Sequence, residues 1–114
     1  MEAIPKQIVY YQTPDKKVPF EIWHDRIEDK RLKKAVRQRL ERAELGNYGD
    51  CEPVGENVLE LRLWEFGVRI YFAEVGRIMM LLLCAGDKSS QVKDIAKAKE
   101  YWAEYRSRDD KEVQ

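Results

Sequence analysis

Apolar and polar residues alternate in two neighbouring runs of the chain, residues 59–63 and residues 68–72. A period of two is typical of β-strands that bury one face. In the first run the leucines share one side, while Glu60 and Arg62 fall on the other. Only a short stretch that ends in glycine separates the runs, so we predict that the two strands form a β-hairpin.

The length of the hairpin loop sets which residues of the two strands face each other. A loop made of Glu65 and Phe66 places Arg62 directly across from Arg69. Two like charges on neighbouring strands destabilise a sheet unless a negative group lies between them. One interpretation is that both arginines are solvated or form salt bridges with Glu60 or Glu65. The alternative is a sheet face that binds phosphate, because guanidinium donates two parallel hydrogen bonds.

The N-terminal half of the chain carries strand, helix and turn signals. Residues 4–12 alternate like a strand, and residues 47–57, with several glycines and a proline, are predicted to form a loop. Pro19 suits the first turn of one helix, and Asp29 suits the N-cap of a second. Apolar residues recur every three or four positions in both helical segments, and Gly46 suits the end of the second.

The third strand of the meander is predicted at residues 78–84, with a break at residues 85–88. Because this strand is apolar throughout, we expect it at the centre of the sheet, covered on both faces. A final helix is predicted from Gln91 to about Arg106, capped by a serine just before it. The charged residues 107–114 are expected to form a flexible tail.

The predicted order of elements is therefore strand, two helices, three strands and helix. Consecutive strands after paired helices favour an α+β fold, with a mostly antiparallel four-stranded sheet, over a doubly wound fold. The first strand is expected beside the first or the last strand of the meander. With 114 residues, the chain has the length of a single domain that spans residues 1–114.

Charge is distributed unevenly along a chain whose formal net charge is zero. Residues 25–44 carry eight basic and five acidic side chains, whereas residues 45–76 carry two basic and six acidic ones. Overall neutrality gives no global field that favours nucleic acid. The local imbalance is compatible with a polyanionic partner and also with a charged protein partner.

Cysteine use and hydropathy predict a cytoplasmic protein without a membrane partner. Cys51 and Cys84 have neither metal-binding nor redox spacing, and Cys84 is expected as a small core residue. The N-terminus lacks a signal-peptide pattern. The longest apolar run, residues 78–85, is too short to span a bilayer.

Several classes of chemistry lack their residues. His24 is the single histidine and is interpreted as a partly exposed helix residue. No HExxH, CxxC or paired-carboxylate spacing is present, which argues against metal-dependent hydrolysis and glycosidase chemistry. Glycine-rich phosphate loops are absent. With His24 as the sole histidine base, we expect no Ser-His-Asp catalytic triad. We therefore predict no metal and no cofactor.

What remains is a group of cations: Arg62, Arg69 and, before the final helix, Lys88. Together with the positive end of that helix they can bind a phosphodiester and stabilise a pentacoordinate transition state. In RNA the neighbouring 2′-hydroxyl is a built-in nucleophile, so this chemistry needs no metal. Lys88 can act as an acid or a charge stabiliser, and Tyr71 as a nearby hydroxyl donor.

Three segments of the chain resemble the RelE/ParE toxin superfamily. They are residues 58–62, residues 68–72 and, most specifically, residues 83–98 with the sequence Gly-Asp-Lys-Ser-Ser-Gln. The resemblance is to the HigB-like, phage-derived "addiction module killer" toxins. It implies a small RelE-like fold that cleaves mRNA, in many members only on the translating ribosome. It also implies a HigA-like helix-turn-helix antitoxin, encoded alongside, that forms a hetero-oligomer with the toxin.

The resemblance also assigns roles by position. In the RNase members, basic residues on the central strands and before the last helix bind the scissile phosphate, and these positions hold Arg62, Arg69 and Lys88. We expect further RNA contacts from Lys33, Lys34, Arg37, Tyr71, Ser89 and Gln91. The hairpin turn is shorter than the usual glycine-rich turn of the family. No C-terminal histidine or tyrosine stands where some relatives use one for acid–base work.

Two alternatives from other classes stay open at the level of sequence. A ParE-like protein inhibits DNA gyrase by binding, without catalysis, so RNA stays intact while supercoiling falls. A decayed toxin keeps antitoxin binding and has no toxicity at any expression level. The leading hypothesis is the mRNA endonuclease, because cationic side chains converge on an otherwise apolar sheet.

Overall fold

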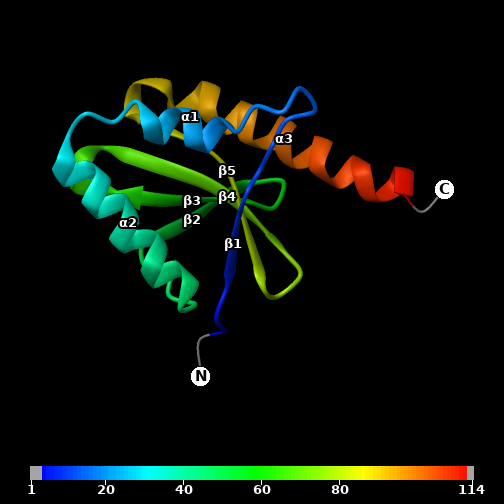
Figure 1. Cartoon of the computed structure of the whole chain (residues 1–114), viewed down its shortest axis with the longest axis horizontal. Helices are drawn as coiled ribbons and strands as arrows, with labels where there is room; N and C mark the ends of the chain where they lie inside the picture. The colour runs from blue at the N-terminus through cyan, green and yellow to red at the C-terminus, as the bar shows by residue number, and fades with distance from the viewer. Residues whose placement is uncertain (1–3, 113–114) are drawn as a thin grey trace.

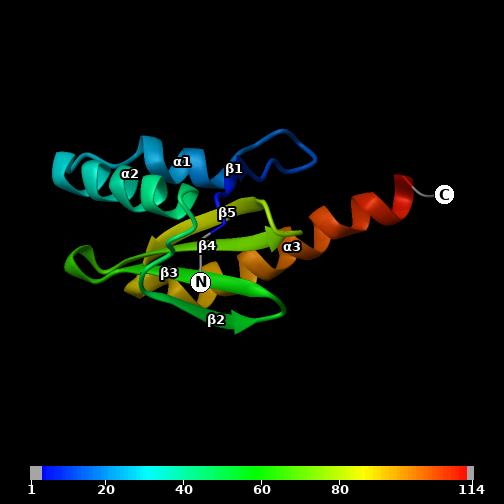
Figure 2. The ribbon, with the colours of Figure 1, turned by 90° about the horizontal axis from the view of Figure 1, so that it is seen from below.

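The computed structural model describes residues 4–112, which form an α+β fold of three layers. Helices α1 (Pro19–Asp25) and α2 (Lys30–Glu44) cover one face of a mixed sheet, and α3 (Gln91–Glu112) packs against the other (Figures 1 and 2). Phe20 and Val36 are buried in the first interface, Ala98 and Trp102 in the second.

The described sheet has five strands, so the predicted number of four is wrong. The strands in chain order are β1 (Gln7–Tyr10), β2 (Cys51–Gly55), β3 (Val58–Leu63), β4 (Val68–Val75) and β5 (Met79–Asp87). Their order across the sheet is β1-β5-β4-β3-β2. Strand β1 pairs with β5 in parallel, beside the last strand of the meander as expected, and the other pairings are antiparallel.

The missed strand is β2, which lies in the segment predicted as a loop. Its Pro53 and Gly55 weaken a strand pattern, but a proline is tolerated on an edge strand because its missing donor interrupts no inner ladder. Glu56 and Asn57 both have positive φ angles, 55° and 65°, as in the type I′ turns that connect antiparallel strands. The segment is therefore one arm of a tight hairpin with β3.

The hairpin between β3 and β4 has the predicted register, with Arg62 paired to Arg69. The turn itself is longer than the two residues predicted. A short 3₁₀ turn, η1 (Trp64–Phe66), leads to Gly67, whose φ of 64° is left-handed. Leu63 and Val68 form the last pair before the turn, so the strand faces remain those that the alternation predicts.

Strand β5 is buried on both faces as expected, but it continues to Asp87 instead of ending at Cys84. A bulge opposite Tyr71 leaves Leu83 without a partner in β4. A Cβ added to Gly86 would lie 1.9 Å from Oδ2 of Asp94 in α3. Glycine at this position therefore allows the first turns of α3 to approach the sheet.

The helix boundaries follow the sequence signals closely at their starts. Pro19 is the first residue of α1, and the Asp29 carboxylate accepts hydrogen bonds from the backbone N–H groups of Arg31 and Leu32 at the start of α2. The final helix continues to Glu112, beyond its predicted end near Arg106, so much of the predicted tail is helical. Residues 113–114 lie outside the described part. No helix between residues 4 and 112 is long and apolar enough to cross a membrane.

Candidate functional site

Arg62 and Arg69 extend from paired positions on the sheet face that carries α3, and both guanidiniums lie against one aromatic ring. The Cζ atoms of Arg62 and Arg69 are 5.2 Å and 5.7 Å from the centre of the Trp64 ring. These distances are within the range of cation–π attraction. The two cations therefore converge, and we call Arg62, Arg69 and Trp64 the arginine cluster.

A buried carboxylate holds one of these arginines. Glu60 is fully buried, and its Oε1 accepts a hydrogen bond of 2.8 Å from Nε of Arg62. Its Oε2 accepts bonds from the Tyr71 hydroxyl (2.9 Å) and from the Gln91 side chain (3.1 Å). Burial opposes ionisation of Glu60, but these donors outweigh it and lower its pKa. Glu60 in turn raises the pKa of Arg62, so the pair is charged.

Arg69 is in a different state, because it is a buried cation with incomplete hydrogen bonding. It is 6% exposed and donates from Nη1 to the carbonyl of Gly67 at 3.0 Å. Its buried Nε has no partner, and among the described residues no carboxylate forms an ion pair with it. A buried, poorly paired charge costs stability. An anion that reached this guanidinium would offset that cost.

Lys88 stands at the same end of the sheet as the arginine cluster. Arg69 pairs with Gly86 of β5, and Lys88 opens the short turn η2 (Lys88–Ser90) directly after β5. Lys88 is exposed. The Asp87 carboxylate accepts bonds from the backbone and hydroxyl of Ser89; these bonds, more than nearby Arg69, lower the pKa of Asp87. The predicted catalytic residues are thus gathered at one end of the sheet.

Two of the predicted RNA-contacting residues form hydrogen bonds with the buried Glu60. Tyr71 is fully buried, and its hydroxyl donates to Glu60, so it has no surface to offer RNA. Burial and then the bond to Glu60 raise the pKa of Tyr71. The Gln91 amide also bonds to Glu60 and connects the first turn of α3 to β3. Both residues support the position of Arg62, Tyr71 from the core and Gln91 from a partly exposed position.

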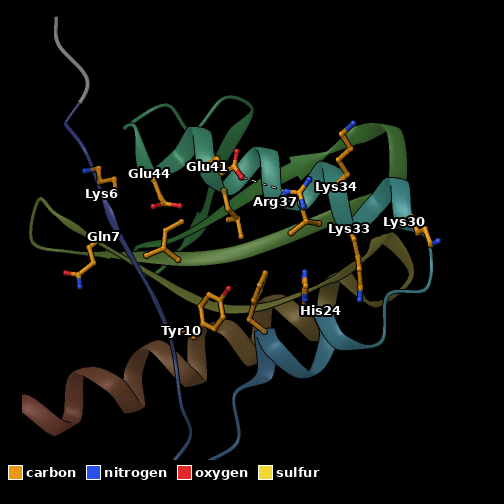
Figure 3. A pocket seen from close by; sticks show the side chains of 14 residues that line it. Lys6, Gln7, Tyr10, His24, Lys30, Lys33, Lys34, Arg37, Glu41 and Glu44 are labelled. Atoms are coloured by element: carbon orange, nitrogen blue, oxygen red, sulfur yellow. Dashed lines mark ion pairs between the residues drawn. The ribbon is translucent and has the colours of Figure 1, made fainter.

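The three predicted contacts on α2 lie on the helix that covers the other face of the sheet. Lys33, Lys34 and Arg37 line an open groove of about 1220 Å³ between α2, α1 and β1, which we call the lysine groove (Figure 3). Arg37 forms an ion pair with Glu41 at 3.8 Å, whereas Lys33 and Lys34 have none among the described residues. The sheet separates these side chains from the arginine cluster.

The interpretation that Arg62 forms a salt bridge with Glu60 is confirmed. Sequence reasoning did not predict that Glu60 is fully buried or that both arginines lie against Trp64. The signal for Glu60 was available as a carboxylate in the same strand, two positions before Arg62 and on the same side. Trp64 continues that alternation past the last paired residue. Among the side chains that the structure describes, those of residues 4–108, no group of three or more His, Cys, Asp or Glu could hold a metal ion.

The fold and the site together define the chain as a small α+β protein with a cationic cluster at one end of its sheet. No family model matches the chain. Over 81 residues it is 38% identical to a protein of Haemophilus influenzae that is described only as uncharacterized, and the alignment covers 70% of this chain and 82% of that protein. The chain belongs to the same family as this Haemophilus influenzae protein.

Proposed function

We propose that this protein is the toxin of a type II toxin–antitoxin pair, a HigB-like member of the RelE/ParE superfamily that cleaves mRNA. The observation that carries the proposal is the arginine cluster: Arg62 and Arg69 meet at one ring, and the buried guanidinium of Arg69 lacks a full set of acceptors. A phosphodiester has the negative charge and the paired oxygen acceptors that guanidinium groups bind.

The chemistry follows from where charge develops during RNA cleavage. The 2′-hydroxyl attacks phosphorus and releases its proton to solvent water, the bond to the 5′-oxygen breaks, and negative charge grows on the phosphoryl oxygens. Arg62 and Arg69 would stabilise that charge from fixed positions, which is the main way that enzymes lower such barriers. Lys88, exposed in the turn that follows β5, would give its proton to the departing 5′-oxygen.

Glu60 serves this mechanism through Arg62 and does not itself touch the RNA. Its hydrogen bond to Nε fixes the guanidinium, and the donors Tyr71 and Gln91 fix Glu60. A guanidinium held in this way loses little freedom when a phosphate binds, so more of the binding energy is left for the transition state. Glu60 is therefore proposed as a positioning residue.

We propose the remaining features of the system on the same basis. The partner would be a HigA-like helix-turn-helix antitoxin that forms a hetero-oligomer with the toxin, and the substrate would be mRNA, cleaved on the ribosome in the cytoplasm. The lysine groove would contribute long-range attraction for RNA from the far side of the sheet. Lys33 and Lys34 support this role because neither has a counter-ion in the described residues.

The proposal is tested by RNA cleavage in a translation extract and by growth after induction. Arg69→Ala and Lys88→Ala are expected to reduce cleavage at least ~100-fold, the usual effect of removing one group that stabilises transition-state charge. Arg77→Ala and Lys17→Ala are the matched controls, because both residues are exposed and Arg77 lies in the turn at the other end of β4 and β5. They should cleave like the wild type.

Two results would remove the assignment. One is full cleavage and toxicity by Arg69→Ala and Lys88→Ala proteins. The other is intact RNA with reduced DNA supercoiling, which would move the protein to the ParE-like class of gyrase inhibitors. Thermal unfolding of each variant separates loss of activity from loss of fold, since Arg69 is buried and Lys88 is exposed.

A further inference from the structure

Trp64 is an exposed aromatic side chain within the arginine cluster. It keeps 62% of its surface exposed, whereas Trp102 is buried and Trp23 is half-buried. It is the first residue of the turn η1, directly after β3. Large aromatic rings are mostly covered in folded proteins, because burying them is strongly favourable. An exposed indole ring beside two cations is therefore a candidate binding surface for a ligand.

The ring is held in place although it is not covered. Arg62 and Arg69 lie against it, and its indole N–H donates a hydrogen bond to the carboxylate of Asp50, in the segment before β2. Contacts from β3, β4 and this segment thus fix the ring at three points. A platform that is already ordered binds with a smaller loss of conformational entropy than a mobile side chain.

A hollow adjoins the ring. Trp64 lines a groove of about 720 Å³ between the end of β3 and α2, together with Arg62, Asp50, Arg42 and Phe66. This volume is within the range of sites for small ligands. The lining is balanced in charge, with Arg39, Arg42 and Arg62 against Glu41, Asp50 and Glu65. The negative part of a ligand therefore belongs at Arg62 and Arg69, and its flat ring at the indole.

A nucleotide in single-stranded RNA meets this description, because each flat base is attached beside a phosphate. Proteins that bind single strands stack bases on aromatic rings and track the backbone with basic residues. A double helix keeps its bases stacked on each other, so an exposed ring favours unpaired segments. An acidic peptide could meet the arginines, but it would offer no flat ring to the indole.

We propose that Trp64 is the stacking platform for one unpaired base of an RNA whose adjacent phosphate binds Arg62 and Arg69. The position of the phosphate rests on the proposed function. The stacking site goes beyond the proposed function, because it specifies a single-stranded segment as the substrate and Trp64 as the residue that binds a base. Stacking tolerates every base, so the site predicts weak sequence preference at this position.

The test compares two fluorescein-labelled probes by anisotropy. One is a short 2′-O-methyl oligoribonucleotide, which cannot be cleaved because its nucleophile is blocked, and the other is an abasic strand of the same length and charge. Trp64→Ala is expected to lower the affinity for the base-containing probe roughly 5- to 150-fold and to change the affinity for the abasic probe by less than about twofold. Trp64→Phe should keep most of the binding, and Arg69→Ala should weaken both probes.

The outcomes separate this inference from the proposed function. Equal binding of the base-containing probe by wild type and Trp64→Ala overturns the stacking site, and so does an equal loss for both probes. Trp64-dependent binding of bases by a protein that leaves RNA intact supports the stacking site while removing the nuclease. Cleavage of RNA together with probe binding that does not depend on Trp64 supports the nuclease and removes the stacking site.

Discussion

Two basic regions lie on opposite faces of the same sheet, and they differ in how their charges are held. In the arginine cluster, Arg69 is almost fully buried and Arg62 is fixed by a buried carboxylate. In the lysine groove, Lys33 and Lys34 are exposed on α2 without an ion pair in the described residues. The first region has defined geometry, and the second has free charge on flexible side chains.

This difference implies different roles in recognising a polyanion. Exposed lysines act over a distance, are screened by salt and impose little geometry. The buried Arg69 acts over a short distance and keeps its strength because water is excluded around it, and the partly exposed Arg62 is fixed by its bond to Glu60. We therefore assign phosphate positioning to the arginine cluster and attraction of RNA to the lysine groove.

The sharpest way to break the comparison is to exchange the cation type in each region. Arg69→Lys keeps the charge but loses the planar fork of donors, and we expect cleavage to fall ~100-fold. Lys33→Arg in the lysine groove should change cleavage less than about twofold, because an exposed charge imposes little geometry. Rates of RNA cleavage measure both. Similar losses in the two variants would show that the regions do not differ in kind.

Stability should follow the same division. Glu60→Gln removes the charge that holds Arg62 and is expected to lower the free energy of unfolding by about 2 kcal/mol, because hydrogen bonds to buried charged groups are strong. Glu41→Gln breaks an exposed pair with Arg37 and should cost less than about 0.5 kcal/mol. Urea unfolding at neutral pH compares the two. Equal, small effects would mean that Glu60 is not charged in the folded protein.

The pH dependence of unfolding gives a further test of the charge on Glu60. Its pKa in the folded protein is below the ordinary value of 4.5, so its stabilising contribution is complete above that value. The contribution is lost as pH falls from there through the lowered pKa. Wild type should therefore lose more stability than Glu60→Gln across this acidic interval in urea titrations. Parallel curves would contradict the lowered pKa.

The smallest effect is expected from the lysine groove. Replacing Lys33, Lys34 and Arg37 together by alanine should weaken RNA binding several-fold at moderate salt and lower the slope of log affinity against log salt by about 2, since each lost contact with single-stranded RNA contributes roughly 0.7. Anisotropy over a salt series measures the slope. An unchanged slope would exclude the groove from RNA binding.

Period-two alternation and a short turn were enough to predict the pairing of Arg62 with Arg69, because these signals are local. Strand β2 escaped prediction because Pro53 and Gly55 hide an edge strand in a turn-like composition. The Glu60 carboxylate accepts a hydrogen bond from Gln91, a residue that comes near only when α3 folds onto the sheet. Periodicity likewise does not reveal which face of the sheet α2 covers. It therefore could not predict that Lys33 lies across the sheet from the arginine cluster.

The most direct test of the central claim is to map RNA ends across the transcriptome after brief induction. We expect new ends to accumulate within translated regions in cells that express wild type, and to be absent with Arg69→Ala while Arg77→Ala matches wild type. An unchanged set of RNA ends during growth arrest by the wild-type protein would contradict the claim that the arginine cluster cleaves RNA.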